Sequence, residues 1–351
     1  MKVLYFPIIA PHSILSNDAG DYQADTLFHG LRSVLGKDLV DGYKMWHLYD
    51  TADKDTLRQL WGKGFTTYGL LPDVEIDRDD IASKIRNNYY EYIICPIHHT
   101  EIKNYAAILD TINRLLKYYS PNKIALVDGW DRAIIDVKLA TKAQYFKREM
   151  YLAYEKIAKP ISFSLPKEKI QELKFERESD FAPLVPAYGH FDDPHQKTYI
   201  YDTEEDYYDM YAKSFFAYTC KKAKEDDVTE GWDCMRHYEV LACGSVPFFT
   251  DIEQCSSLIL TKFPKELCVK AKKIRGVYPG TKSPYDPNKD TFIGTSKQIK
   301  AGNERGYINH DEFDLDEYED VRQQFREHTL KHLTTESMAK YLLEEMRKCS
   351  E

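Results

Sequence analysis

Residues 231–249 constrain the fold of this chain more than any other segment. They read Gly-Trp-Asp-Cys-Met-Arg-His-Tyr-Glu-Val-Leu-Ala-Cys-Gly-Ser-Val-Pro-Phe-Phe. Arg236 and Glu239 are three residues apart, so a helix would place the cation and the carboxylate on one exposed face. Gly244 stands where a helix ends in a left-handed residue, and residues 246–249 form a short apolar strand. This order of helix, glycine and buried strand predicts a crevice of the kind that α/β folds use for nucleotides.

Short apolar segments alternate with amphipathic segments of helical length in the first half of the chain. The predicted strands are residues 2–9, 92–97, 123–128 and 161–165, and the predicted helices are residues 22–35 and 103–118. Such alternation is typical of a parallel sheet with helices on both faces. Residues 167–197 are rich in proline and charge and show no clean period, so they are predicted to link two domains.

The second half begins the alternation again. The predicted strands are residues 198–201, 246–249 and 267–269, and a helix is predicted over residues 205–220. Glycines, prolines and lysines in residues 275–306 predict an irregular surface segment, and residues 315–349 read as helical, with Thr334 or Thr335 capping the last helix. We expect an α/β fold of two Rossmann-like domains, 1–166 and 198–351, with C-terminal helices that can pack back on the first domain.

Composition supports a two-domain protein without a membrane span. The 351 residues exceed the usual size of a single core, and 43% of them are hydrophobic. No segment approaches the ~18 apolar residues of a membrane span, and the first residues read as a strand and not as a signal peptide. The seven cysteines are odd in number and lack ligand spacing. They are therefore interpreted as reduced thiols, without a disulfide or zinc role.

Residues 231–249 resemble the sugar-nucleotide-binding signature of GT-B glycosyltransferases, with Glu239, Ala242, Gly244 and Pro247 as the matching positions. They are still more similar to exostosin-like glycosyltransferases of bacteria, large DNA viruses and phages. That family carries Lys-Lys, Gly-Trp-Asp and Arg-His-Tyr-Glu, followed by a small residue, Gly, any two residues and Pro. Here the three blocks are residues 221–222, 231–233 and 236–239, with residues 224–230 interposed before the second. Residues 28–33 and 145–149 also resemble blocks of the family.

The resemblance implies the GT-B fold, in which the two domains face each other across a cleft. It also implies a nucleotide-diphosphate sugar as donor, UDP-linked in preference, and no cofactor. Glu239 would accept hydrogen bonds from the ribose hydroxyls, because a carboxylate offers two acceptor oxygens. Arg236 would stabilise the charge that grows on the diphosphate as the sugar leaves. The alternatives are a surface glutamate and an ion pair within the helix.

Further residues are candidates for the donor site. Lys221 and Lys222 would assist on the phosphates, although two lysines at a helix end are equally consistent with a solvated position. Trp232 would stack on the base or, as the favoured alternative, pack in the core. Gly244 would close the donor pocket. Two cations of the first domain, Lys147 and Arg148, would reach phosphate from the opposite wall or form structural salt bridges.

The catalytic base would come from the first domain, where an Asp or His after a strand can take the proton of an acceptor hydroxyl. The candidates, in order, are Asp128, Asp21 and His98. Asp21 has an alternative role as a helix cap. The Asp-x-Asp strings at 77–79 and 314–316 do not follow a predicted strand. We therefore predict transfer without a metal ion, with cations and a helix dipole in its place.

Charge is unevenly distributed along the chain. The net charge is -9, but residues 262–305 carry eleven Lys or Arg against four Asp or Glu. This stretch is interpreted either as a solvated loop or as a polyanion site. The first acceptor class is a glycan or glycoconjugate, and the alternative is a hydroxymethylated pyrimidine base in double-stranded phage DNA.

Two other classes of protein are compatible with parts of the sequence. A sugar-nucleotide-binding protein without catalysis would need only the Glu239 pocket. A Rossmann-type oxidoreductase is disfavoured, because no G-x-G-x-x-G follows a predicted strand. We expect a hexosyl- or pentosyltransferase in the cytoplasm of a bacterium or of a virus-infected cell.

Overall fold

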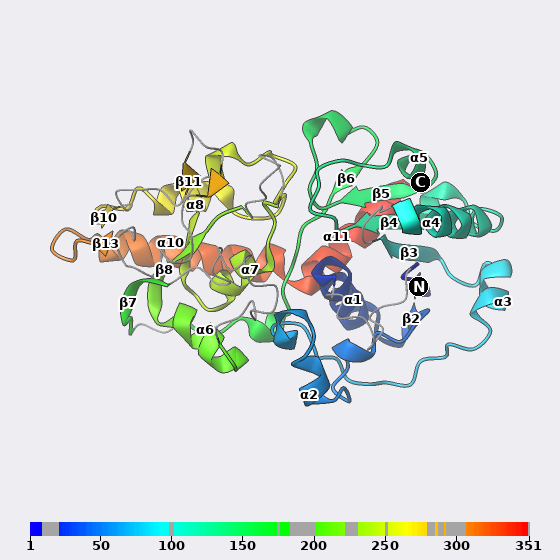
Figure 1. Cartoon of the computed structure of the whole chain (residues 1–351), viewed down its shortest axis with the longest axis horizontal. Coiled ribbons are helices and arrows are strands. Elements are labelled where there is room, and N and C mark those ends of the chain that lie inside the picture. The colour runs from blue at the N-terminus through cyan, green and yellow to red at the C-terminus, as the bar shows by residue number, and fades with distance from the viewer. Residues whose placement is uncertain are drawn as a thin grey trace. The chain divides into compact units, whose positions relative to one another are not determined.

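The structure, a computed structural model, describes residues 1–8, 21–97, 102–173, 176–182, 201–221, 231–249, 252–278, 285–286, 291–292 and 307–349. The chain divides into two compact units. Unit 1 comprises Met1–Pro166, Ser256–Thr261 and Thr334–Glu351, and unit 2 comprises Lys167–Cys255 and Lys262–Leu333. The chain therefore leaves unit 1 and returns to it twice. Figure 1 shows the elements of each unit.

Unit 1 is built on a six-stranded parallel sheet with the order β2-β1-β3-β4-β5-β6. The strands are β1 (Val3–Tyr5), β2 (Leu39–Asp41), β3 (Tyr92–Ile97), β4 (Ile124–Asp128), β5 (Gln144–Lys147) and β6 (Lys159–Pro160). The chain moves from β1 to β2 in one direction and from β3 to β6 in the other. This order is that of a doubly wound sheet, whose switch point lies between β1 and β3. The predicted parallel α/β class is confirmed.

Helices cover both faces of this sheet. They are α1 (Tyr22–Leu35), α2 (Lys54–Leu57), α3 (Ile81–Arg86), α4 (Ile102–Leu115), α5 (Val137–Ala140) and α11 (Thr335–Lys348). Because side chains alternate along a strand, Val3 and Tyr5 of β1 join one core with α1 and α11, whereas Leu4 joins the core on the opposite face. Helix α11 lies beside α1 (Figure 1).

Close packing of these two helices depends on a small residue. A Cβ at Gly30 of α1 would lie 1.9 Å from the carbonyl oxygen of Thr335, so only glycine allows this approach. Thr334 caps α11 by accepting the N–H of Ser337, as the sequence predicts. The N–H of Thr335 donates to the carbonyl of Leu165 at 2.9 Å, which ties the start of α11 to the segment after β6.

The predicted strands of unit 1 need correction. Residues 161–165 are not a strand: only Leu165 forms an isolated bridge, with Thr334. All five of these residues are nevertheless buried, and the apolar ones alternate with serines, which explains the strand-like pattern. Strands β2 and β5 were not predicted, because β2 is only three residues long and β5 ends in the charged Lys147.

Unit 2 contains a three-stranded parallel sheet with the order β7-β8-β9. Its elements are β7 (Ser179–Ala182), α6 (Glu204–Ala212), β8 (Ser214–Thr219), α7 (Met235–Ala242), β9 (Val246–Phe249), α8 (Lys265–Ala271) and α10 (Leu315–His328). Two antiparallel pairs complete it: β10 (Val277–Tyr278) with β13 (Tyr307–Ile308), and β11 (Tyr285–Asp286) with β12 (Thr291–Phe292). Helix α7 and strand β9 confirm the predicted order of helix, glycine and strand.

Several boundaries in unit 2 differ from the prediction. The expected helix 205–220 ends at Ala212 and continues as β8, whose Phe216 and Tyr218 stack on Phe181 of β7. Aromatic residues favour a strand where such cross-strand pairs form. The expected strand 267–269 is part of α8, which buries Cys268 and Ala271 on one helical face. Residues 179–182 of the expected linker form β7, and residues 183–200 lie outside the described part.

Candidate functional site

The carboxyl ends of β8 and β9 meet at one edge of the unit 2 sheet, where Thr219 pairs with Phe249. Ligands bind outside the carboxyl ends of strands in open parallel sheets. Lys221 follows β8, and Trp232 precedes α7. The Trp232 ring stacks on Phe249 at 6.2 Å between centroids, and Lys221 Nζ lies 5.6 Å from the centre of the Trp232 ring. Two predicted donor residues are thus brought together at this edge.

Trp232 is only 4% exposed, in agreement with the favoured packing role. The Nε2 atom of His237 lies 2.9 Å from the carbonyl oxygen of Trp232, which fixes the backbone before α7. Lys222, the partner of Lys221 in the predicted pair, lies outside the described residues.

Glu239 lies in the middle of α7 and is 2% exposed. Its Oε2 accepts a hydrogen bond of 2.6 Å from the hydroxyl of Tyr207, which comes from the neighbouring helix α6. A buried carboxylate is costly unless hydrogen bonds or charges compensate for the lost water. Tyr207 therefore orients one carboxylate oxygen of Glu239.

Arg236 lies one turn before Glu239 and is also 2% exposed. The expectation of an exposed pair is therefore wrong, because every residue of α7 is buried. Tyr211 of α6 lies near both charges. Burial raises the pKa of Tyr211 far above its ordinary value. The positive charge of Arg236 opposes this rise, and the negative charge of Glu239 adds to it. A cation, a carboxylate and two tyrosines thus share the interior between α6 and α7.

Gly244 has a φ of 70°, which is the left-handed conformation that the sequence predicts after α7. A Cβ here would lie 2.6 Å from Leu173. The Gly244 carbonyl accepts hydrogen bonds from Arg322 at 2.8 Å and from Arg177 at 3.0 Å. These contacts are made within unit 2 and fix the turn into β9, while a contact of Gly244 with a donor stays a prediction.

In unit 1, Asp128 ends β4 and is 1% exposed. Three donors converge on its carboxylate: the hydroxyl of Tyr145 at 2.5 Å, the N–H of Trp130 at 2.9 Å and the ammonium of Lys147 at 3.1 Å. Burial lowers the pKa of Lys147, although the charge of Asp128 partly restores it. Lys147 also donates to the carbonyl of Trp130. Lys147 and Asp128 thus form a buried ion pair.

Arg148 is equally engaged by its own unit. It donates to the carbonyl of Gly129 at 3.0 Å and 3.1 Å, and forms ion pairs with Asp131 and Glu149. Its guanidinium also lies 4.5 Å from the ring centre of Phe163. These contacts match the structural salt-bridge interpretation of Lys147 and Arg148, and contact of either residue with a donor phosphate remains a prediction.

Asp21 precedes α1 and caps it by accepting the N–H of Gln23 at 3.0 Å. The capping role of the alternative interpretation is therefore present. Asp21 also lies close to the end of β4, because a Cβ at Gly129 would be 2.9 Å from Asp21 Oδ1. The fold thus brings two base candidates, Asp21 and Asp128, to one edge of the sheet. The third candidate, His98, lies outside the described residues.

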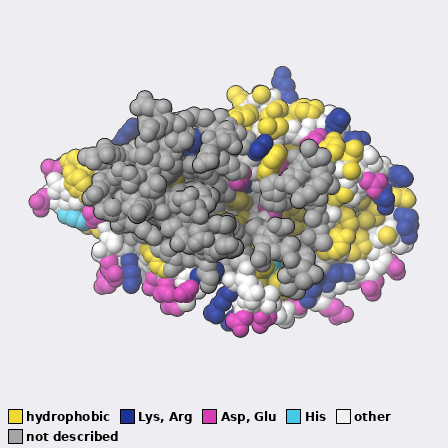
Figure 2. Space-filling model, viewed as in Figure 1, with side chains coloured by type: hydrophobic (Ala, Val, Ile, Leu, Met, Phe, Trp, Pro, Cys, Tyr) yellow, Lys and Arg dark blue, Asp and Glu magenta, His cyan; other side chains and the backbone are white. Residues whose placement is uncertain are grey.

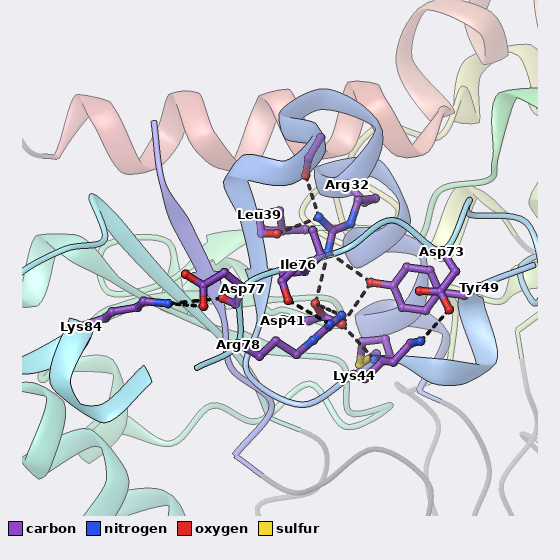
Figure 3. A network of polar contacts seen from close by, with 12 residues as sticks. Arg32, Leu39, Asp41, Lys44, Tyr49, Asp73, Ile76, Asp77, Arg78 and Lys84 are labelled. Carbon is purple, nitrogen blue, oxygen red and sulfur yellow. Dashed lines mark hydrogen bonds and ion pairs between the residues drawn. The ribbon is translucent and has the colours of Figure 1, made fainter. Parts of the chain in front are cut away.

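A second buried polar network surrounds Asp41 at the end of β2 (Figure 3). Asp41 Oδ1 pairs with Arg32 at 3.2 Å and with Arg78 at 2.8 Å, and Oδ2 accepts the hydroxyl of Tyr49 at 3.1 Å. Arg32 also donates to the Tyr49 hydroxyl at 3.1 Å. The network joins α1, β2 and the segment before α3, and in it two guanidinium groups share one buried carboxylate.

Sequence reasoning missed Tyr207, Tyr145, Asp25 and His47. Tyr207 and Tyr145 belong to aromatic-rich segments in which no spacing distinguishes a hydrogen-bonding tyrosine from a packing one. Asp25 of α1 and His47 lie 22 residues apart, and His47 Nε2 is 2.8 Å from Asp25 Oδ1. The acidic first turn of α1 was the available signal for this pair.

The basic stretch 262–305 is described only in part. There, Lys270 pairs with Asp320 at 3.1 Å, Lys272 with Glu253 at 2.6 Å, and Arg275 with Asp314 at 3.8 Å. On the coloured part of the face in Figure 2, Lys and Arg side chains lie among Asp and Glu side chains. The described cations thus favour the interpretation as a solvated surface over a polyanion site.

No group of three or more His, Cys, Asp or Glu side chains with the arrangement of a metal site occurs among the described residues. Within the same part of the chain, no helix is long and apolar enough to cross a membrane. The cysteines of this part are free thiols.

Comparison with solved structures gives a structural likeness. No family model matches the chain, and no curated protein matches it. A solved structure described as an alpha-glucosyltransferase in complex with UDP-glucose and DNA containing an abasic site is similar to it. The two share 12% sequence identity, the match covers 99% of each chain, and the TM-score is 0.39.

Proposed function

We propose that this chain is a glycosyltransferase of the exostosin-like type, which moves a hexose or pentose from a nucleotide-diphosphate donor to an acceptor hydroxyl. The observation that supports it most is the buried Glu239, held by Tyr207 one turn after Arg236. Arg236 and Glu239 lie on α7, the helix that leads through Gly244 into the buried strand β9, as in the sugar-nucleotide signature that the sequence resembles. The favoured donor is UDP-linked.

The chemistry of unit 2 suits the donor. An oriented carboxylate accepts hydrogen bonds from vicinal hydroxyls of a ribose, and a guanidinium stabilises the negative charge that grows on the leaving diphosphate. Lys221 beside Trp232 adds a second cation at the carboxyl edge of the sheet. Because these cations can neutralise the diphosphate, we propose transfer without a metal ion, which excess chelator should leave unchanged.

Unit 1 is the proposed source of the catalytic base. A base needs to receive the acceptor proton at hydrogen-bond distance. Asp128 already carries three donors, so it would have to exchange one of them for the acceptor hydroxyl. Asp21 lies at the same edge of the sheet and caps α1 through the N–H of Gln23. The proposed candidates for the base remain, in order, Asp128, Asp21 and His98.

The acceptor is proposed to be a glycan or glycoconjugate, with a hydroxymethylated base in DNA as the alternative. A sugar-nucleotide-binding protein without catalysis would have the same donor site. Incubation with UDP-glucose separates these classes, because a transferase releases some glucose to water whereas a binding protein returns the donor intact. The same assay with other nucleotide sugars would identify the donor.

The donor assignment is tested by Glu239→Gln, which keeps the side-chain volume and an acceptor for Tyr207. We expect UDP-glucose binding to weaken by about 1.5 to 3 kcal/mol in calorimetry, the contribution of hydrogen bonds to a charged group. The control is Glu205→Gln on the exposed face of α6, which should leave binding unchanged. Unchanged affinity in a folded Glu239→Gln protein would remove Glu239 from the donor site.

A further inference from the structure

The first turn of α1 contains a buried side chain whose polar atoms the fold does not satisfy. Gln23 is 1% exposed, and neither its amide oxygen nor its amide nitrogen has a hydrogen-bond partner among the described residues. Asp25 is also 1% exposed, and its Oδ2 has no partner in that part of the chain. Unsatisfied buried polar atoms are costly, and native proteins retain few of them. Two such side chains within three residues of each other need an explanation.

The position of Gln23 and Asp25 in the fold explains their unsatisfied polar atoms. Helix α1 follows β1, and the switch point of the sheet lies between β1 and β3, where a doubly wound sheet opens a crevice for ligands. A Cβ at Gly129, directly after β4, would lie 2.9 Å from the Cβ of Gln23 and 2.9 Å from Asp21 Oδ1. Gln23 therefore faces the carboxyl edge of the sheet, beside the base candidate Asp21.

The surroundings of Asp25 add an aromatic wall. His47 Nε2 lies 2.8 Å from Asp25 Oδ1, and the His47 ring contacts Tyr68 edge-on at 4.9 Å between centroids. Tyr22 of α1 stacks on the same Tyr68 ring at 6.4 Å. Aromatic faces next to amide and carboxylate groups are a common lining of sites for small polar ligands.

Local charge restricts the ligand further. Burial raises the pKa of Tyr5 well above its ordinary value, and the carboxylates of Asp21 and Asp25 raise it more, so the field at this edge is negative. The neighbouring cations Lys147 and Arg148 are matched by carboxylates of unit 1. A phosphate would be repelled, whereas a neutral group that donates hydrogen bonds would satisfy Asp25 Oδ2 and the Gln23 oxygen.

We propose that Gln23 and Asp25 form a binding site for a neutral, hydroxyl-bearing group, and that this group belongs to the acceptor. The inference rests on the proposed function only in assigning the acceptor to unit 1. A sugar hydroxyl and the hydroxymethyl group of a modified base share this chemistry. The Gln23 amide nitrogen donates to the ligand oxygen, and the ligand hydroxyl donates to a carboxylate or amide oxygen.

The experiment is saturation-transfer NMR on the full chain with three probes: methyl glucoside, hydroxymethyl-deoxycytidine and glucose phosphate. We expect one neutral probe to bind, which identifies the source, and the anionic probe to bind more weakly or not at all. Gln23→Leu, of similar volume, should lower the affinity for the neutral probe at least tenfold. Gln59→Leu, at an exposed position of unit 1, is the matched control.

Thermal unfolding and donor titration complete the test. Gln23→Leu should raise the melting temperature, because it removes an unsatisfied amide, and should leave UDP-glucose affinity unchanged. Asp25→Asn, which keeps an acceptor for His47, should also lower the affinity for the neutral probe. Failure of both neutral probes to bind, equal binding by Gln23→Leu, or loss of folding in that variant would overturn the site. Failure of the proposed function would show instead as unchanged donor binding in Glu239→Gln.

Discussion

Tyr207 holds one oxygen of Glu239 through a hydrogen bond of 2.6 Å, and the sharpest residue-scale prediction concerns this contact. Tyr207→Phe keeps the packing of the ring between α6 and α7 but releases the carboxylate. We expect UDP-glucose affinity to fall about 3- to 10-fold, which corresponds to the ~1 kcal/mol of a lost hydrogen bond. Calorimetry measures the change, and turnover at saturating donor should fall less.

The matched control lies in the same unit. Tyr278 donates to Glu312 at the same distance of 2.6 Å, at the surface and on β10. Tyr278→Phe removes an equivalent tyrosine–glutamate bond without touching α7. If both variants bind the donor as the wild type does, Tyr207 has a packing role only.

Tyr49 gives a prediction about alkaline pH. Burial raises its pKa to about 12, and the charge of Asp41 adds to this rise, although Arg32 opposes it. Between the unfolded pKa of about 10 and the folded pKa, the unfolded chain loses the phenol proton first. This residue therefore contributes stability that is fully present below about pH 10 and is lost as the pH rises toward 12.

Tyr49→Phe removes this contribution together with the hydrogen bonds to Arg32 and Asp41. The variant should be less stable than the wild type near neutral pH, and its disadvantage should shrink by about 1.4 kcal/mol at about pH 11. Urea unfolding of both proteins at several pH values measures the difference. A difference that stays constant to about pH 11 would contradict the raised pKa.

At the scale of the elements, the close packing of α1 on α11 depends on Gly30. Gly30→Ala would bring a Cβ within 1.9 Å of the Thr335 carbonyl oxygen, a backbone atom that cannot rotate away. We expect a loss of about 2 to 4 kcal/mol in the free energy of unfolding, because the helices would have to separate. Ser33→Ala, on the exposed face of α1, is the control and should change stability by less than about 0.5 kcal/mol. Equal stability of the two variants would show that α11 can move.

Sequence reasoning predicted the elements whose apolar period and end signals agree. Helix α1 has Asp21 before it and Gly36 after it, and α7 ends before the left-handed Gly244. It failed where tertiary contacts override local pattern, as in β8, where cross-strand aromatic pairs end the predicted helix at Ala212.

The candidate site also has features that local sequence predicts and features that depend on tertiary contacts. Glu239 and Arg236 were predicted as donor residues because a motif carries them, whereas their burial and the Tyr207 contact depend on how α6 packs on α7. The Asp25–His47 pair joins residues 22 positions apart. No local spacing predicts such a pair, because the turn of chain between them decides which side chains meet.

At the scale of the whole molecule, net charge separates the two acceptor classes. The chain carries a charge of -9, and three of the described cations of the basic stretch form ion pairs. Each phosphate neutralised by a protein gives a log-log salt slope of about -0.9. We expect replacement of Lys270, Lys272, Lys273 and Arg275 by Ser to change any slope for duplex DNA by less than about one.

Fluorescence anisotropy with a labelled duplex at several salt concentrations measures this slope. A change of several units would assign the basic stretch to DNA contact. Absence of duplex binding at about 50 mM salt, where electrostatic attraction is strong, would eliminate the DNA alternative and leave the glycan. Donor binding should be the same in the wild type and in the variant with the four replacements.

The return of the chain to unit 1 at Thr334 has a consequence for synthesis. Residues 335–348 supply Met338, Leu342 and Met346 to the core that α1 covers, yet the ribosome makes them after all of unit 2. Nascent unit 1 therefore presents an uncovered apolar face while more than 160 further residues are translated. Chains stalled before Thr334 should be cleaved in unit 1 by a brief pulse of protease, whereas released chains resist it. Unit 1 would then emerge before unit 2 and complete its core after it.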